Sequence, residues 1–254
     1  MQMHIPADLI CKLHIRLGIW QEKMHNGGIV MKTYSVAIDG PAGAGKSSVA
    51  KAAAAQLRFI YIDTGAMYRA VALYAIRNNL PYDNEGGKLA AALDNIEISI
   101  EYVENAQHIF LNGEDVSGLI RTPQVSAGAS AVATVQAVRI KLVELQRKLA
   151  QGKNVIMDGR DIGTHVLPDA DVKIYLTASA DARAKRRFIE LLEKGEQVEL
   201  ETIKKEIIAR DKNDSEREFS PLRQAEDAVL VDNSDMNLEE SIAYVISLIQ
   251  KGIK

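Results

Sequence analysis

A glycine-rich stretch near the start of the chain, IDGPAGAGKSS at residues 38–48, limits the protein to a small number of folds. It matches the pattern of a glycine, four residues, a second glycine, Lys46 and Ser47. In this pattern backbone N–H groups surround phosphate oxygens, the lysine reaches the outer phosphates, and the hydroxyl binds Mg²⁺. The pattern works between a buried strand and a helix. Residues 34–38 are apolar like such a strand and residues 46–57 have a helical composition, so the sequence predicts a nucleotide site in an α/β fold.

The rest of the chain, from Met31 onward, alternates short apolar runs with helical patterns. This alternation is typical of a largely parallel sheet with helices on both faces. The predicted strands are Ser35 to Ile38, Phe59 to Ile62, Val155 to Met157, Val172 to Leu176 and Ala228 to Val231. The predicted helices are Lys46 to Leu57, Ala66 to Asn78, Ala131 to Ala150, Ala182 to Lys194, Leu200 to Lys212 and Leu238 to Lys251.

Two segments do not follow this alternation. Residues 80–123 contain the alternating runs IEISIEYV and HIFLNGEDV, which predict an antiparallel pair inserted as a subdomain. Residues 182–223 read as two charged helices separated by Gly195, which predicts a helical hairpin exposed to solvent.

Composition excludes several classes of protein. The chain has 254 residues, one cysteine (Cys11) and a formal net charge of −3. A general nucleic-acid-binding protein would show a strongly basic domain or stripe. A single cysteine cannot form an intramolecular disulfide and suits a reducing compartment. We therefore expect a cytoplasmic protein without nucleic-acid or membrane partners, and a monomer.

Residues 1–30 differ from the rest. Leu9, Leu13 and Leu17 recur every four residues, as on one helix face, but charged residues interrupt the apolar run. This excludes a signal-peptide core and a membrane span. A transit peptide or docking helix is an alternative, although Asp8 and Glu22 are unusual in transit peptides. We expect an extension outside the fold, with Met31 as an alternative start.

Two strand-like runs end in polar residues that suit phosphate chemistry. DTGAMYRA, at residues 63–70, begins a helix whose free N–H groups form an anion site, with Arg69 further along it. DGRD, at residues 158–161, places Asp158 where a carboxylate could hold Mg²⁺. The structural alternatives are a helix cap with a solvated arginine and a turn-forming Asp-Gly. Because ligands gather at the carboxyl ends of parallel strands, we expect both turns and the glycine-rich loop to face one crevice.

The predicted helical hairpin carries five arginines, namely Arg183, Arg186, Arg187, Arg210 and Arg217. Phosphoryl transfer needs alignment and positive charge around the moving group, which an arginine-bearing lid supplies. A closing lid also excludes water. Because glutamates are interleaved, an ordinary solvated helix face is the alternative interpretation.

Together these stretches resemble one family. IDGPAGAGKSS, DTGAMYR, NGEDVSGLIR, DGRDIGT, PDADVKIYLTAS and IARDKNDSER are similar to sequences of bacterial cytidylate kinases, from about Lys32 to the C-terminus. The resemblance implies a P-loop kinase with a three-layer α/β fold over residues 31–254. Its parts would be a central five-stranded parallel sheet, an antiparallel insertion that binds the nucleoside monophosphate, and a helical lid. The implied reaction transfers the γ-phosphoryl group of ATP to CMP or dCMP, in pyrimidine nucleotide metabolism.

The resemblance also implies roles for individual residues. The expected ATP contacts are Gly40, Pro41, Ala42, Gly43, Ala44, Gly45, Lys46, Ser47 and Ser48. The expected acceptor contacts are Thr64, Arg69, Ser130, Arg139, Arg160, Asp161, Arg210, Asp214 and Arg217, of which Ser130, Arg139 and Asp161 would recognise the cytosine ring. The expected catalytic residues are Lys46, Arg160, Arg186 and Arg187, and the expected Mg²⁺ contacts are Ser47 and Asp158.

Two other classes of protein use the same loop. A GTPase switch would need an Asn-Lys-x-Asp guanine reader, and the chain has no Asn-Lys dipeptide. Kinases for uridylate, adenylate, thymidylate or shikimate share the loop, sheet and lid, so only the acceptor pocket distinguishes them.

Overall fold

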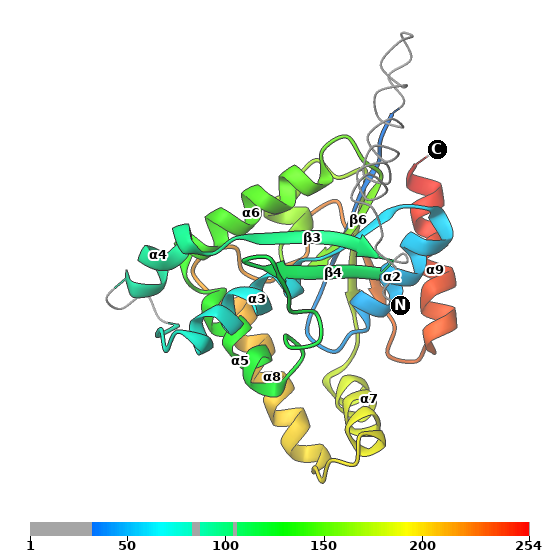
Figure 1. The fold of residues 1–254 in the computed structure, drawn as a ribbon. Helices are drawn as coiled ribbons and strands as arrows, with labels where there is room; N and C mark the ends of the chain where they lie inside the picture. The colour runs from blue at the N-terminus through cyan, green and yellow to red at the C-terminus, as the bar shows by residue number, and fades with distance from the viewer. Residues whose placement is uncertain (1–31, 83–86, 104–105, 254) are drawn as a thin grey trace, which may run out of the picture. The chain divides into compact units, whose positions relative to one another are not determined.

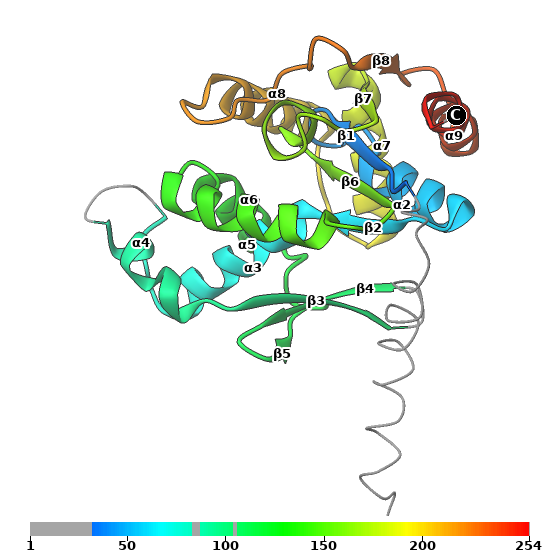
Figure 2. The same cartoon turned by 90° about the horizontal axis from the view of Figure 1, so that it is seen from above.

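The computed structural model describes residues 32–82, 87–103 and 106–253. The expected extension at residues 1–30 lies outside them. Residues 34–254 form one compact unit. Its centre is a five-stranded sheet, all of whose neighbouring strands pair in parallel, in the order β2-β6-β1-β7-β8 (Figures 1 and 2). The strands are β1 (Ser35–Asp39), β2 (Ile60–Asp63), β6 (Val155–Gly159), β7 (Val172–Thr177) and β8 (Val229–Asp232). All five predicted strands are therefore present.

Helices cover both faces of this sheet. α2 (Lys46–Leu57) and α9 (Leu238–Gly252) pack on one face, against alternate strand residues such as Val36 and Ile38. α3 (Thr64–Arg77) and α6 (Gln136–Ala150) cover the other face. This arrangement confirms the three-layer prediction. Successive residues of β1 face opposite helical layers, which explains why the strand is apolar on both sides.

The turn from β1 into the phosphate loop, residues 40–48, requires glycine at its first position. Gly40 has φ +146, and a Cβ atom built there would lie 1.9 Å from the carbonyl oxygen of Leu176 on β7. No side chain fits between the two strands at this distance. The loop therefore leaves the sheet tightly and delivers Lys46 to the start of α2.

The insertion consists of more than the predicted antiparallel pair. Its strands are β3 (Ile98–Val103), β4 (Ala106–Leu111) and the short β5 (Glu114–Asp115), preceded by α4 (Lys88–Ala92) and the 3₁₀ turn η2 (Leu93–Asn95). In Figure 2 this small sheet lies on the far side of α3, α5 (Pro123–Val132) and α6 from most of the central sheet, and β4 also approaches the edge strand β2. Apolar side chains from these helices and from β3 and β4 form one continuous core.

Strand β2 forms one edge of the central sheet, and the insertion covers that edge. The Tyr102 hydroxyl donates to the Tyr61 carbonyl oxygen at 2.7 Å. The Asp63 backbone N–H donates to the Gln107 side-chain oxygen at 2.9 Å. Two side chains of the insertion thus satisfy backbone groups that a neighbouring strand would otherwise pair with.

The charged hairpin is present as α7 (Ala180–Glu193) and α8 (Leu200–Glu216), which pack through a small apolar core of their own, including Ala184, Leu191 and Ile207. We call this pair the lid. In Figure 1 it projects from the central sheet.

No helix in the described ranges combines the length and apolar character that crossing a membrane requires.

The predicted helix from Ala131 to Ala150 has the wrong start. Its first two residues end α5, residues 133–135 separate the two helices, and α6 covers the remainder from Gln136. α5 begins at Pro123, where the Thr122 hydroxyl caps it by accepting from the Val125 N–H at 3.2 Å. The sequence analysis did not predict α5 as a separate helix.

Candidate active site

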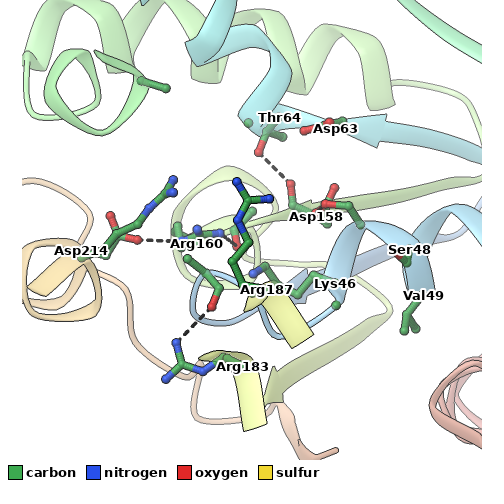
Figure 3. Close-up of a pocket in the computed structure, with 18 of the residues that line it drawn as sticks. Lys46, Ser48, Val49, Asp63, Thr64, Asp158, Arg160, Arg183, Arg187 and Asp214 are labelled. Carbon is green, nitrogen blue, oxygen red and sulfur yellow. Dashed lines mark hydrogen bonds and ion pairs between the residues drawn. The ribbon is translucent and has the colours of Figure 1, made fainter. Parts of the chain in front are cut away.

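A single cavity of about 720 Å³ lies at the carboxyl ends of the central strands. It brings together most of the residues predicted for nucleotide binding (Figure 3). The phosphate-loop residues that line it are Ala42, Gly43, Gly45, Lys46, Ser47 and Ser48. The acceptor and lid residues that line it are Thr64, Arg69, Ser130, Arg139, Asp158, Arg160, Asp161, Arg186, Arg187, Arg210, Asp214 and Arg217. Gly40, Pro41 and Ala44 support the loop from behind and are buried.

Lys46 lies at the bottom of the phosphate loop. Its ammonium donates to the Pro41 carbonyl oxygen at 2.6 Å, and the residue is only 5% exposed. Burial and the charge of Arg160 lower the pKa of Lys46 well below its usual range, while Asp158 and Asp39 oppose this shift. A bound phosphate would add negative charge beside the ammonium and favour its protonated form.

Ser47 and Asp158 meet across the loop. The Ser47 hydroxyl donates to Asp158 Oδ2 at 2.7 Å, and the Tyr61 hydroxyl donates to Oδ1 at 2.9 Å. Burial, together with the charge of Asp63, raises the pKa of Asp158 to about 6. A hydroxyl and a carboxylate beside a phosphate loop are suitable oxygen ligands for Mg²⁺, which usually binds through one or two carboxylates and substrate phosphates.

The start of α3 carries the residues of the second predicted anion site. Asp63 caps the helix by accepting from the Ala66 N–H at 2.8 Å. Its other carboxylate oxygen accepts from Arg69 at 2.9 Å and contacts Arg121 at 3.4 Å. Thr64 is buried and its hydroxyl donates to the Asp158 carbonyl oxygen at 2.7 Å. The sequence analysis gave a helix cap as the alternative interpretation of this stretch, and Asp63 does cap α3. It assigned no contact to Arg121, although that residue lies within a stretch that it singled out.

Arg160 connects strand β6 to the lid. Its Nε donates to Asp214 Oδ2 on α8 at 2.8 Å (Figure 3). The positive charges of Arg160, Arg210 and Arg217 lower the pKa of Asp214 despite its burial. Burial and the charge of Arg160 in turn lower the pKa of Arg210. Three arginines thus gather around Asp214, an arrangement that suits a site for an anionic ligand.

Asp161 lies between two arginines at the far end of the cavity. Its carboxylate accepts from Arg139 of α6 and lies 3.5 Å from the Arg217 guanidinium at the end of α8. All three side chains are less than 8% exposed. The Arg139 guanidinium also lies over the Tyr68 ring, 5.6 Å from its centroid. Nε of Arg139 is buried without a hydrogen-bond partner, so the cluster retains a free donor.

Three arginines of α7 approach the cavity in different ways. Arg183 is buried, donates to the Ala42 carbonyl oxygen of the phosphate loop at 3.0 Å, and pairs with Asp211 of α8 at 2.7 Å. Arg186 donates to the backbone oxygens of Asn233 and Met236, after β8.

Arg187 pairs with Glu190 on its own helix at 2.8 Å, and in Figure 3 its side chain extends into the cavity. Of the three arginines, Arg187 is the one for which no hydrogen bond to a backbone oxygen is described.

Asp39, the last residue of β1, is a buried acid that the motif analysis did not assign. It is 5% exposed. Its Oδ1 accepts from the Ile162 N–H at 2.8 Å and its Oδ2 from the Gly163 N–H at 2.7 Å. The sequence feature that could have indicated a role for Asp39 is an acidic residue at the end of an apolar strand. Burial, the largest effect, raises the pKa of Asp39 to about 6 despite these hydrogen bonds.

The raised pKa of Asp39 predicts a specific pH dependence of stability. An acid whose pKa is higher in the folded state stabilises the fold fully below its unfolded pKa of about 4, and this contribution is lost as pH rises through 6. The loss amounts to about 3 kcal/mol. Since the Asp39→Asn variant lacks this titration, the unfolding free energy of the wild type minus that of the variant should fall between pH 4 and 7. Urea unfolding of both proteins across this range measures it, and a constant difference would contradict the assignment.

Comparison with known proteins completes the description of the site. A family model for cytidylate kinase matches residues 36–251. Cytidylate kinase of Caldicellulosiruptor bescii is 52% identical over 225 residues, which cover 88% of this chain and 99% of that protein. Cytidylate kinase of Bacillus cytotoxicus is 48% identical over 223 residues, which cover 88% and 99% respectively. The family match includes the phosphate loop, the insertion and the lid.

Proposed function

The chain belongs to the cytidylate kinase family, and on that premise we propose that it transfers the γ-phosphoryl group of ATP to CMP or dCMP. The products are ADP and CDP or dCDP. The observation that best supports this function is the Asp161 carboxylate between Arg139 and Arg217, in the same cavity as the phosphate loop. Donor and acceptor would lie in one cavity, as direct transfer requires.

The donor side would be built from the phosphate loop. Its backbone N–H groups, with the start of α2, would bind the phosphates of ATP, and Lys46 would neutralise charge on the β- and γ-phosphates. Ser47 and Asp158 would hold Mg²⁺, as their 2.7 Å contact allows. When bound, Mg²⁺ would draw phosphate oxygens together and balance part of their charge.

The acceptor side would read both the base and the phosphate. Cytosine presents an N4 amino donor, which a carboxylate such as Asp161 accepts, and ring acceptors suited to Arg139 and Ser130. Uracil presents an oxygen in place of the amino group. An unpaired buried polar group costs about 1–3 kcal/mol, so the site should disfavour uracil.

Arginines would surround the phosphates at the centre of the cavity. We assign Arg69 and Arg160 to the acceptor phosphate, with Thr64 beside them. Arg210, Asp214 and Arg217 would surround the ribose and phosphate. Arg186 and Arg187 would bring positive charge from the lid to the transferring group. The chain itself supplies no covalent step, because alignment and charge stabilisation are sufficient for in-line displacement.

We propose that the enzyme acts as a cytoplasmic monomer on free nucleotides, with no nucleic-acid or membrane partner. A net charge of −3 and a single cysteine in the sequence support this expectation.

An acceptor panel tests the function. Purified protein is given ATP, Mg²⁺ and, in turn, CMP, dCMP, UMP, AMP, GMP and dTMP, and ADP formation is followed. We expect kcat/KM for CMP and dCMP to exceed that for UMP by about 10-fold to 100-fold, which corresponds to one mispaired polar group. If another nucleotide is best, the base-reading roles of Ser130, Arg139 and Asp161 are wrong. If no acceptor is used although ATP binds, the kinase proposal itself fails.

A further inference from the structure

The carboxylate of Asp39 joins the phosphate-loop strand to the acceptor segment. Each of its oxygens accepts one backbone N–H, from Ile162 at 2.8 Å and from Gly163 at 2.7 Å. These residues follow Arg160 and Asp161 directly. Asp39 itself is followed directly by Gly40, the first residue of the phosphate loop. One buried side chain therefore ties together the two segments to which donor and acceptor recognition are assigned.

The two N–H groups belong to a turn that cannot pair them internally. Residues Ile162–Val166 form η3, a single π-helical turn. Its internal bonds run from the N–H groups of His165 and Val166 back to the Asp161 carbonyl oxygen, and from that of Leu167 back to the Ile162 carbonyl oxygen. The first N–H groups of any helical turn lack such partners. Asp39 supplies both acceptors from another strand, so the orientation of the turn depends on this side chain.

Other side chains surround the turn closely at position 163. A Cβ atom built on Gly163 would lie 3.2 Å from the Lys173 side chain, closer than most such contacts, and 3.4 Å from Asp39 Oδ2, an ordinary van der Waals distance. The Asp39 carboxylate is therefore in packing contact with the turn as well as hydrogen-bonded to it.

We propose that Asp39 is a positioning residue for acceptor recognition, which it serves by fixing the backbone that aims Asp161 and Arg160 into the cavity. Asp161 precedes the anchored turn and meets Arg139 and Arg217, while Arg160 meets Asp214. A small rotation of this backbone would move both side chains away from the acceptor together. The inference rests on the proposed function for the identity of the acceptor, but not for the contact itself.

Asp39 also faces the charge of Lys46, which favours the ionised carboxylate, and that of Asp161, which opposes it. A role through Lys46 would act on ATP, whereas a role through the turn would act on the monophosphate. The two roles therefore differ in which substrate is affected when Asp39 is replaced.

Kinetics of two variants distinguish these roles. Asp39→Asn retains the shape and one acceptor oxygen, while Asp39→Ala removes both acceptors. We expect KM for CMP to rise about 10-fold in the first variant and about 100-fold in the second, as for small misplacements of a binding group. KM for ATP should change by less than about threefold, because backbone N–H groups carry most of that site. The preference for CMP over UMP should fall in the same order.

Asp227→Asn is the matched control. Asp227 pairs with Lys173, whose side chain packs against Gly163, but Asp227 is exposed and gives no hydrogen bond to the turn in the interactions described. This control should keep both KM values and the CMP preference. The control distinguishes the loss of any carboxylate near the turn from the loss of the Asp39 carboxylate that accepts the two N–H groups of the turn.

Several results would overturn the proposal. If KM for ATP rose as much as KM for CMP, Asp39 would act through Lys46 or through the stability of the fold and not through the turn. An unchanged preference for CMP over UMP would mean the same. An Asp39→Asn protein that fails to fold, as judged by thermal unfolding, would likewise assign Asp39 to stability. If the wild type prefers another monophosphate, the proposed function fails. The KM of that acceptor, compared with that of ATP, then reports on Asp39.

Discussion

Replacing Lys46 by methionine should lower kcat about 10³-fold while the protein remains folded, because the substitution removes a buried positive charge aimed at the phosphates. Methionine keeps most of the side-chain volume. The only hydrogen bond described for the ammonium joins it to the Pro41 carbonyl oxygen. Burial already lowers the pKa of Lys46, so loss of the charge removes a desolvation cost from the free protein. The loss should therefore appear in turnover and not in stability.

Lys51→Met is the control for this experiment. Lys51 is an exposed lysine on the same helix, α2, and should tolerate the change with normal kcat. Initial rates at saturating ATP and CMP, with thermal unfolding of all three proteins, provide the comparison. If Lys46→Met turned over normally, charge stabilisation by the phosphate-loop lysine would not be part of the mechanism.

Replacing Asp161 by asparagine should lower kcat/KM for CMP about 10²-fold, because an unsatisfied buried polar group costs about 1–3 kcal/mol. An amide offers only one acceptor oxygen and carries no charge, so it cannot hold Arg139, Arg217 and a cytosine amino group together. Activity with UMP should fall less, because uracil has no amino group for Asp161 to accept. The variant should thus narrow the preference for CMP over UMP, with KM for ATP changed little.

The same variant tests stability. Breaking a buried ion pair leaves an uncompensated charge and costs about 3–5 kcal/mol, so the unfolding temperature of Asp161→Asn should be lower. Asp169→Asn, an exposed change beyond the η3 turn, is the control for both measurements. Equal losses with CMP, UMP and ATP would mean that Asp161 supports the cavity as a whole and does not read the base.

The sequence predicted the central sheet well because parallel strands buried on both faces are apolar throughout. Each predicted strand lies within a residue or two of its observed bounds, and α2 was predicted from Lys46 to Leu57 as observed. The start of the helix after the insertion was predicted wrongly for a physical reason. The run from Ala131 to Ala150 is rich in helix-forming residues, whereas the observed α5 and α6 are separate helices that both pack against α3 in one core, a tertiary arrangement that composition does not show.

Other features missed by sequence reasoning depend on tertiary contacts. β5 consists of two residues, which is too short for any periodic pattern, and is defined only by its pairing with β4. The phosphate-loop residues could be predicted because their function requires particular residue types at fixed spacings along the chain. Asp39 lies within the IDGPAGAGKSS stretch, but its role could not be predicted because its partners Ile162 and Gly163 lie more than 120 residues away along the chain.

The contacts of Tyr102 and Gln107 with strand β2 have a consequence for solubility. An uncovered edge strand presents backbone donors and acceptors to any other chain, which favours sheet extension between molecules. Here the Tyr61 carbonyl and the Asp63 N–H of that edge are occupied by the insertion. A protein shortened by deleting residues 80–123 would therefore lose protection against aggregation through this edge. The insertion thus also helps to keep this kinase from associating with itself through β2.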